Sequence, residues 1–171
     1  MIELINLITN IIDYRGKTPL KLGLNWSSNG KYIALSAKNV KTGKLINLDN
    51  AYRGDEELYK KWMKDEIKKG DILITSEAPF GEVYYWNSDE KIILSQRLYC
   101  ISPDNTKIIP RFLYYSMCSD NFQKQLYSQS TGSTVTGLRQ NALLSCSINV
   151  FDIELQQHIV DIIKNEVLLC C

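Results

Sequence analysis

The stretch GDILITSEAPFGEVYYW, residues 70–86, decides the fold of this chain. It contains two short apolar segments, DILIT at 71–75 and EVYYW at 82–86, separated by the turn sequence APFG. A third segment, KIILSQRLYCIS at 91–102, follows the turn sequence NSDE. Short runs rich in β-branched and aromatic residues, bounded by Gly, Pro, Asn, Asp or Ser, indicate strands. We therefore predict a twisted, mainly antiparallel sheet built around these three segments.

Amphipathic helices are predicted on either side of these strands. Residues 55–69 place Leu58, Trp62 and Ile67 near one face, and Gly70 ends the segment. Pro110 opens a second helix over 110–128, because proline fits the first helical turn. The predicted fold class is α/β of the mixed α+β kind, with helices flanking the sheet.

The remaining segments are shorter and more polar. Residues 2–12 fit either a short helix or a strand, and residues 13–31, rich in Gly, Ser, Asn and Pro, are predicted to form a long loop. A loop of that length in a compact domain is usually functional or mobile. Further predictions are strands at 32–36, 44–48 and 146–150, a polar loop at 129–137, a helical turn at 138–144 and a last helix capped by Asp152.

Length and composition fit one domain. The chain has 171 residues, of which 44% are hydrophobic, and a net charge of +1, so it is long enough to bury a core. We expect a cytoplasmic protein without membrane contact, because no secretory signal or membrane-length apolar run stands out. The five cysteines form no C-x-x-C pair, and His158 is the single histidine. We therefore expect reduced thiols and no metal site.

Charge is distributed unevenly along the chain. Residues 14–44 carry seven lysines and arginines and no acid, and residues 105–151 carry four against Asp120 alone. Residues 152–171 are acidic, with four carboxylates against Lys164. Clustered cations attract DNA phosphates regardless of sequence, whereas single lysines are usually solvated. The two basic segments therefore favour a polyanionic partner without specifying it.

Three segments in a fixed order carry a resemblance to a known family: residues 70–86, ILSQRLYCISP at 93–103, and residues 130–163, which begin STGSTVTGLRQ. A strand leads to a turn with a glycine, and a helix follows a proline. A Gly/Ser/Thr loop then leads to a strand that ends just before a helix beginning near QQHIV. This ordered set resembles a target-recognition domain of the specificity subunit of type I restriction–modification systems. One departure lies at 151–153, where that family usually has prolines.

The resemblance implies a non-catalytic chain that reads one half of a split DNA site. In that family the full subunit carries two such domains, held apart by long helices that dock modification subunits. Methyl transfer and cleavage belong to other subunits, so no cofactor is expected in this chain. The implied partners are double-stranded DNA and modification subunits, with a restriction subunit as a further option. Residues 1–151 would form the DNA-reading domain, and residues 152–171 the start of a spacer or dimerisation helix.

DNA contacts are expected from several kinds of side chain. Cations and hydroxyls hold phosphates, while amides, arginines and carboxylates discriminate base edges. Gln96 and Arg97 fall within the predicted strand at 91–102. The candidate DNA-binding residues are Arg15, Lys17, Lys38, Asn39, Lys41, Ser76, Glu77, Gln96, Arg97, Ser130, Thr131, Ser133, Thr134 and Arg139. Structural alternatives stay open: ion pairs for Glu77 and Arg97, an Asx turn for Asn39, and a plain surface connection for residues 130–137.

The last helix carries a short apolar seam. Ile153, Val160 and Val167 recur every seven residues, with Ile163 beside them, which is the spacing of a coiled coil. We predict the start of a coiled-coil arm that meets a partner, either a second copy or another half-subunit. Two other hypotheses stay open. One is an inactive or truncated specificity fragment that acts as a protein-interaction module, and the other is a β-rich enzyme that uses Cys100 or His158.

Overall fold

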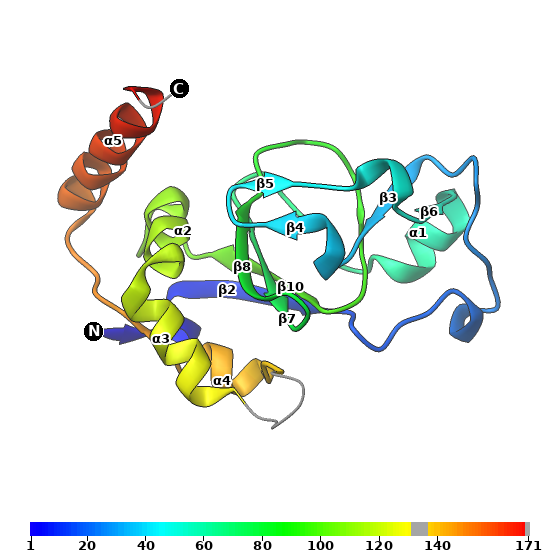
Figure 1. Cartoon of the computed structure of the whole chain (residues 1–171), viewed down its shortest axis with the longest axis horizontal. Coiled ribbons are helices and arrows are strands. Elements are labelled where there is room, and N and C mark those ends of the chain that lie inside the picture. The colour runs from blue at the N-terminus through cyan, green and yellow to red at the C-terminus, as the bar shows by residue number, and fades with distance from the viewer. Residues whose placement is uncertain (131–136, 170–171) are drawn as a thin grey trace.

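A four-stranded antiparallel sheet, in the order β2-β10-β7-β8, lies at the centre of the chain (Figure 1). The computed structural model describes residues 1–130 and 137–169, and the side chains of the last helix as far as Glu166. The segment 70–86 forms the β7–β8 hairpin, as its sequence predicts. The four strands are β2 Ile8–Asp13, β7 Ile72–Ser76, β8 Phe80–Tyr85 and β10 Leu98–Pro103.

The central strands of this sheet are apolar at nearly every position. Both faces of the sheet therefore need a cover of other elements. Side chains alternate between the two faces along a strand. In β7, Ile72 and Ile74 belong to a core shared with helices α2 (Pro110–Cys118) and α3 (Asp120–Gln129). Leu73 belongs to a second core shared with α1 (Glu56–Trp62). The unbroken apolar run DILIT is therefore the sequence signature of burial on both sides.

Smaller pairings surround the central sheet and complete a mixed α/β fold with mainly antiparallel strands, which confirms the predicted fold class. Figure 1 shows α1, β3 and β6 at one end, and α2, α3 and α5 at the other. Strands β3 and β9 run parallel. The smaller sheets consist of β6 (Arg53–Gly54), β3 (Tyr32–Leu35) and β9 (Ile93–Leu94); β4 (Val40–Lys41) and β5 (Lys44–Leu45); and β1 (Ile2–Glu3) and β11 (Ser147–Ile148). Short 3-10 helices cover Leu4–Leu7, Leu20–Leu22, Ala37–Asn39 and Leu48–Asn50, and α4 covers Gln140–Leu144.

The helix predicted over 55–69 is wrong in its second half, because α1 ends at Trp62. Trp62 is fully buried, and its indole N–H donates to the Leu94 carbonyl at 2.9 Å. The Leu94 N–H in turn donates to Met63 Sδ at 3.3 Å. These contacts with strand β9 draw the chain away from the helical path directly after Trp62.

Several other elements are shorter than predicted. The helix predicted over 110–128 is divided at Ser119, whose Oγ accepts from the Phe122 N–H at 3.4 Å and donates to the Ser116 carbonyl at 2.7 Å. The hydroxyl thus ends α2 and caps α3. The strands predicted at 44–48 and 146–150 have two residues each, and the strand predicted at 91–102 is interrupted between β9 and β10.

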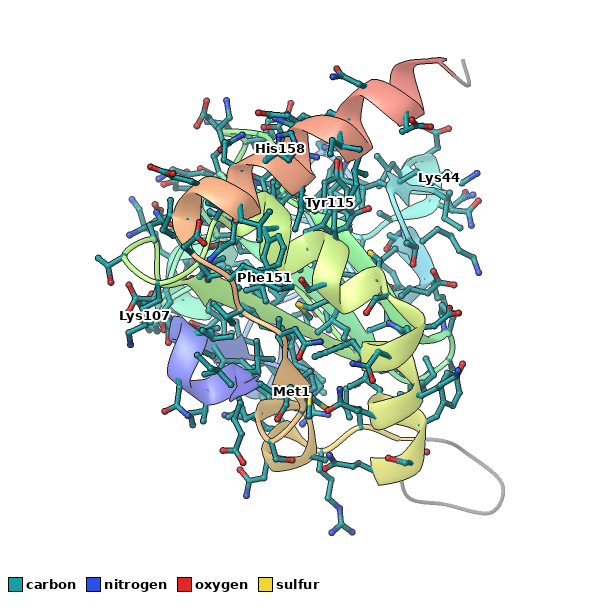
Figure 2. All side chains as sticks on the ribbon, turned by 90° about the vertical axis from the view of Figure 1, so that its left-hand side faces the viewer. Met1, Lys44, Lys107, Tyr115, Phe151 and His158 are labelled. Carbon is teal, nitrogen blue, oxygen red and sulfur yellow. The ribbon has the colours of Figure 1, made fainter. Side chains whose placement is uncertain are left out.

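Helix α5 (Ile153–Leu169) begins where Asp152 caps it, as predicted. The Leu155 N–H donates to Asp152 Oδ1 at 2.9 Å. Figure 2 looks onto the side of the molecule that carries α3 and α5, with His158 on α5 and Phe151 in the segment leading into it.

Of the seam predicted along α5, Val160 is corrected by the burial of its side chain. Val160 is 1% exposed and packs into the core of its own domain, so it is not open to a partner helix. Ile153 is exposed, and the side chain of Val167 lies outside the described part of the helix. Leu155 and Ile162, also seven residues apart, are 40% and 48% exposed. The open apolar face of α5 therefore runs through Leu155 and Ile162.

Candidate DNA interface

A groove of about 550 Å³ with a mixed polar and apolar lining opens at the end of the molecule that carries β3 and β6. Its walls come from four separated parts of the chain, including the long loop after β2 and the turn between β9 and β10. Among the residues that line it are Lys17, Trp26, Lys38, Asn39, Asn47, Asn50, Tyr52 and Gln96. The fold thus brings together candidate residues from three separate segments: Lys17, the adjacent pair Lys38 and Asn39, and Gln96.

Lys17 is held in a fixed position within this groove. Its Nζ donates to the Trp62 carbonyl at 2.6 Å and lies 3.8 Å from the centroid of the Tyr14 ring. Burial, together with the nearby charge of Lys64, lowers the pKa of Lys17. A cation already held in place loses less side-chain freedom when it meets an anion. Lys17 therefore presents a preorganised positive charge to the groove.

Lys38 is exposed on the 3-10 helix Ala37–Asn39, whose geometry is set by Asn39. Asn39 is buried, and its Oδ1 accepts from both the N–H and the hydroxyl of Ser36 at 3.0 and 3.2 Å. Its Nδ2 donates to the carbonyls of Ile46 and Asn47, both at 3.2 Å. All four hydrogen-bonding positions of the amide are used, so the prediction that Asn39 reads a base is corrected. Asn39 instead positions Lys38.

Gln96 and Arg97 form the turn between β9 and β10, which corrects their predicted place within a continuous strand. The Gln96 carbonyl accepts from the Ala37 N–H at 3.1 Å, and the Arg97 carbonyl accepts from the Ser76 N–H at 2.9 Å. Arg97 adopts the left-handed conformation, with φ of 63°. The backbone of the turn is thus fixed by two neighbouring segments, while both side chains are exposed.

Glu77 lies beside this turn and pairs with Arg97. The Arg97 Nε and Glu77 Oε1 are 3.7 Å apart, and the Arg97 side chain is 46% exposed. Ion pairs of this length and exposure contribute little to stability. A ligand can therefore exchange Glu77 for its own acceptor at little cost, which leaves Arg97 available for binding.

Arg15 is bound within the protein, which corrects its prediction as a loop cation open to DNA. Its Nε and Nη2 donate to the two carboxylate oxygens of Asp13 at 2.8 and 2.9 Å. Its Nη1 donates to the Leu138 carbonyl at 3.1 Å, and its guanidinium lies 4.1 Å from the centroid of the Tyr99 ring. The Tyr99 hydroxyl donates to the same Leu138 carbonyl at 2.9 Å. Arg15 and Tyr99 together hold Leu138, the residue before Arg139.

Two further candidates, Ser76 and Lys41, make contacts within the protein. Ser76 is 1% exposed, and its carbonyl accepts from the Leu138 N–H at 2.9 Å. Ser76 therefore helps Arg15 and Tyr99 to hold Leu138 in place. Lys41 does not line the groove, and its Nζ lies 3.0 Å from Glu82 Oε1 on β8. The burial of Ser76 corrects its prediction as a direct DNA contact, whereas Lys41, whose side chain is 45% exposed, stays a prediction.

The candidates around the Gly/Ser/Thr loop are described only in part. The Ser130 hydroxyl donates to the Tyr127 carbonyl at 2.7 Å, one turn back along α3. Arg139 is exposed at the N-cap of α4, directly after Leu138, whose backbone is held by hydrogen bonds. Thr131, Ser133 and Thr134 lie outside the described residues.

Asn47, Asn50 and Tyr52 line the groove but were not among the sequence candidates. Asn47 adopts a left-handed conformation, with φ of 54°, and starts the 3-10 helix Leu48–Asn50. The segment LDNAY at 48–52 holds a turn signal in its Asp-Asn pair. That signal would have moved Asn47 from the end of a predicted strand into a loop.

No group of three or more His, Cys, Asp or Glu side chains lies close enough together to hold a metal ion in the described part of the chain. No described helix is both long enough and apolar enough to cross a bilayer.

Comparisons with known proteins agree on one family. The family described as "Type I restriction modification DNA specificity domain" matches residues 7–167. The specificity subunit of the type I restriction enzyme HindI from Haemophilus influenzae is 30% identical over 104 residues, which cover 58% of this chain and 23% of that subunit.

Two solved structures share the fold. The crystal structure of the type I restriction–modification S subunit from M. genitalium superposes with a TM-score of 0.63 at 15% identity, covering 95% of this chain and 37% of that one. The HsdS subunit from Thermoanaerobacter tengcongensis gives a TM-score of 0.65 at 14% identity, covering 96% of this chain and 40% of that one. This chain thus spans well under half the length of these relatives. The chain belongs to the family of type I restriction–modification DNA specificity domains.

Proposed function

We propose that this chain binds double-stranded DNA and recognises one half of a split target sequence for a type I restriction–modification complex. The observation that carries the proposal is the groove, which gathers Lys17, Lys38 and Gln96 from separate segments. Cations that fix DNA phosphates and an amide that discriminates base edges are the two kinds of contact that sequence recognition needs. Membership of the specificity-domain family supports the same function.

The residues divide into two proposed roles. Lys17, Lys38 and Arg139 contact phosphates, because they are cations on loops or helix ends. Gln96 and Arg97 read base edges, since their backbone is fixed and their side chains are exposed. Glutamine can pair with adenine and arginine with guanine in bidentate fashion. Glu77 holds Arg97 in the free protein, and a cytosine amine is a further partner for its carboxylate.

The partners of the chain follow from the family and from α5. We propose that residues 1–151 form the DNA-reading domain and that residues 152–171 begin a spacer or dimerisation helix. Leu155 and Ile162 are exposed, and Ile163 is half-buried, so α5 offers these side chains to another helix. That helix belongs to a second copy, to another half-subunit or to a modification subunit. Methylation and cleavage take place in the partner subunits, not in this chain.

The test is to co-express the chain with its modification subunit and to map methylated sites across the host genome. Recognition predicts methylation within a defined split sequence. Gln96→Ala and Arg97→Ala should then change that sequence, whereas Lys124→Gln should not, because Lys124 is an exposed cation on α3, outside the groove. A methylation pattern that stays the same in all three variants would show that Gln96 and Arg97 do not read the DNA sequence.

A binding measurement separates failed recognition from failed assembly. The full chain, alone and with the modification subunit, is titrated against a labelled random-sequence duplex at low salt, where phosphate contacts are strongest. Binding that weakens steeply with added salt supports the proposal. Absence of binding in both preparations would contradict it and would favour a protein-interaction module.

A further inference from the structure

An aromatic ladder runs from the core to the rim of the groove. Trp62 is fully buried, and Trp26 packs against it with ring centroids 5.5 Å apart. Tyr52 stacks on Trp26 with centroids 5.2 Å apart and 8° between the ring planes. Tyr52 is nevertheless 67% exposed. Since Trp26 covers one face of the Tyr52 ring, the exposed surface includes the opposite face.

The outer part of the ladder is fixed by the backbone on both sides. The Ser27 N–H, next to Trp26, donates to the Arg53 carbonyl at 2.8 Å. The Ala34 N–H of strand β3 donates to the Tyr52 carbonyl at 2.8 Å. A ring held in this way gives up little conformational freedom when a ligand packs on it. Tyr52 is therefore a preorganised flat surface.

The chemistry around this surface suits a nucleic-acid strand. Lys17 and Lys38 line the same groove as Tyr52, and Gln96 and Asn50 add amides. Flat aromatic rings among cations are a common means of holding the sugars and bases of nucleic acids. In an intact duplex the face of each base is covered by its neighbours in the stack, whereas the sugars lie open along the edges of the grooves.

We infer that Tyr52 packs its open face against a deoxyribose of the strand whose phosphates Lys17 and Lys38 contact. The inference rests on the proposed function and adds a contact that the sequence did not indicate. Every base pair presents the same sugar, so Tyr52 adds affinity without adding sequence information. The contact is apolar and releases no counterions, so its contribution does not change with salt.

The test measures how affinity varies with salt. The full chain and its variants are titrated by fluorescence anisotropy against a labelled random-sequence duplex over a series of salt concentrations. Tyr52→Ala should bind about tenfold more weakly at every salt concentration, with an unchanged slope of log affinity against log salt. Tyr52→Phe should bind like the wild type, because it keeps the ring. The matched control is Tyr127→Ala, since Tyr127 is 57% exposed on α3 and does not line the groove.

The outcomes distinguish failure of the Tyr52 contact from failure of DNA binding itself. Wild-type binding with unchanged affinity for Tyr52→Ala overturns the Tyr52 contact and leaves DNA binding intact. Absence of wild-type binding removes both together. If Tyr52→Ala does not fold, judged by its melting temperature, Tyr52→Leu replaces it with the same expectation. A rise in 2-aminopurine fluorescence on binding that Tyr52→Ala abolishes would show an unstacked base on the ring and would overturn the sugar contact.

Discussion

Replacing Gln156 with alanine should loosen the attachment of α5 to the rest of the domain. Gln156 is fully buried in the first turn of α5. Its Oε1 accepts from the Ile109 N–H at 2.8 Å, and its Nε2 donates to the Phe151 carbonyl at 2.8 Å. A third contact, with the Lys107 carbonyl at 3.4 Å, is longer than a typical hydrogen bond. Gln156 therefore ties α5 to the residue that precedes α2 and to the segment that leads into α5.

The expected loss in the free energy of unfolding is about 2–4 kcal/mol, summed from three effects. Truncation leaves the Ile109 N–H and the Phe151 carbonyl without a partner, and each unpaired buried group costs about 1–3 kcal/mol. Phe151 is 44% exposed, so water replaces part of that bond and the lower end of the range applies there. Lost packing of the side-chain methylenes costs about 1 kcal/mol more, and the entropy of the freed side chain offsets a similar amount.

Urea unfolding of Gln156→Ala and Gln157→Ala gives the measurement and its control. Gln157 is exposed, and its amide donates only to Asp161 Oδ1, at 2.8 Å, one turn further along the same helix. Such a pair is worth about 0.5 kcal/mol at most. Gln156→Ala should also lower Tm by roughly 4–16 °C and speed hydrogen exchange at the Ile109 amide. Equal stabilities for the two variants, or unchanged exchange at Ile109, would refute the prediction that Gln156 attaches α5 to the rest of the domain.

Three further outcomes are expected. Arg97→Ala should relax recognition at one base pair by about 1–3 kcal/mol, and methylation mapping would detect this as a degenerate position. Lys38→Gln should reduce the steepness of log affinity against log salt by about 0.9, measured by anisotropy. Burial acts to raise the pKa of Glu82, but hydrogen bonds from Thr42 and the ion pair with Lys41 outweigh it and lower the pKa. A carboxylate with a depressed folded-state pKa contributes stability above its unfolded-state pKa, and this is lost as pH falls through the folded-state pKa. In urea unfolding, the advantage of the wild type over Glu82→Gln should therefore hold at neutral pH and begin to fall only as the pH drops below the unfolded-state pKa of glutamate, about 4.3.

The central sheet could be predicted because its sequence signal is local. The segments at 71–75 and 82–86 are apolar, rich in β-branched or aromatic residues, and separated by a turn. Those properties favour a hairpin before any tertiary contact exists. The two segments pair as the antiparallel β7–β8 hairpin, in which Leu73 lies opposite Tyr84 and Ile74 opposite Val83.

The length of α1 could not be predicted, because the residues after it make contacts that compete with the helix, one of them with a distant part of the chain. The Tyr14 hydroxyl accepts from the Asp65 N–H at 2.9 Å and donates to the Asp65 carboxylate at 3.2 Å. The Lys68 N–H donates to the carboxylate of Asp71 at 2.8 Å. Residues 63–69 favour a helix by composition, but these partners offer their backbone an alternative that outweighs a weak local propensity.

The sequence identified some residues of the groove but not the groove itself. Residue type identified Lys17, Lys38 and Gln96, since cations and amides are the side chains that DNA contact requires. Residue type did not show that these three side chains share one groove, because its walls come from segments up to about 80 residues apart. Tyr52 was missed for a different reason: an exposed tyrosine becomes informative only when its stacking partner, here Trp26, is known.

Arg15 and Arg97 show why charge alone does not identify a DNA contact. Both are arginines, and each lies close to a carboxylate. The carboxylate of Asp13 accepts two short hydrogen bonds from Arg15, whereas Glu77 Oε1 lies 3.7 Å from Arg97 Nε. The acid-free run counted from residue 14 begins one residue after Asp13, so it leaves out the carboxylate that neutralises its first cation. Whether an arginine remains available for DNA depends on how firmly its nearest carboxylate holds it, and by that measure Arg97 is available and Arg15 is not.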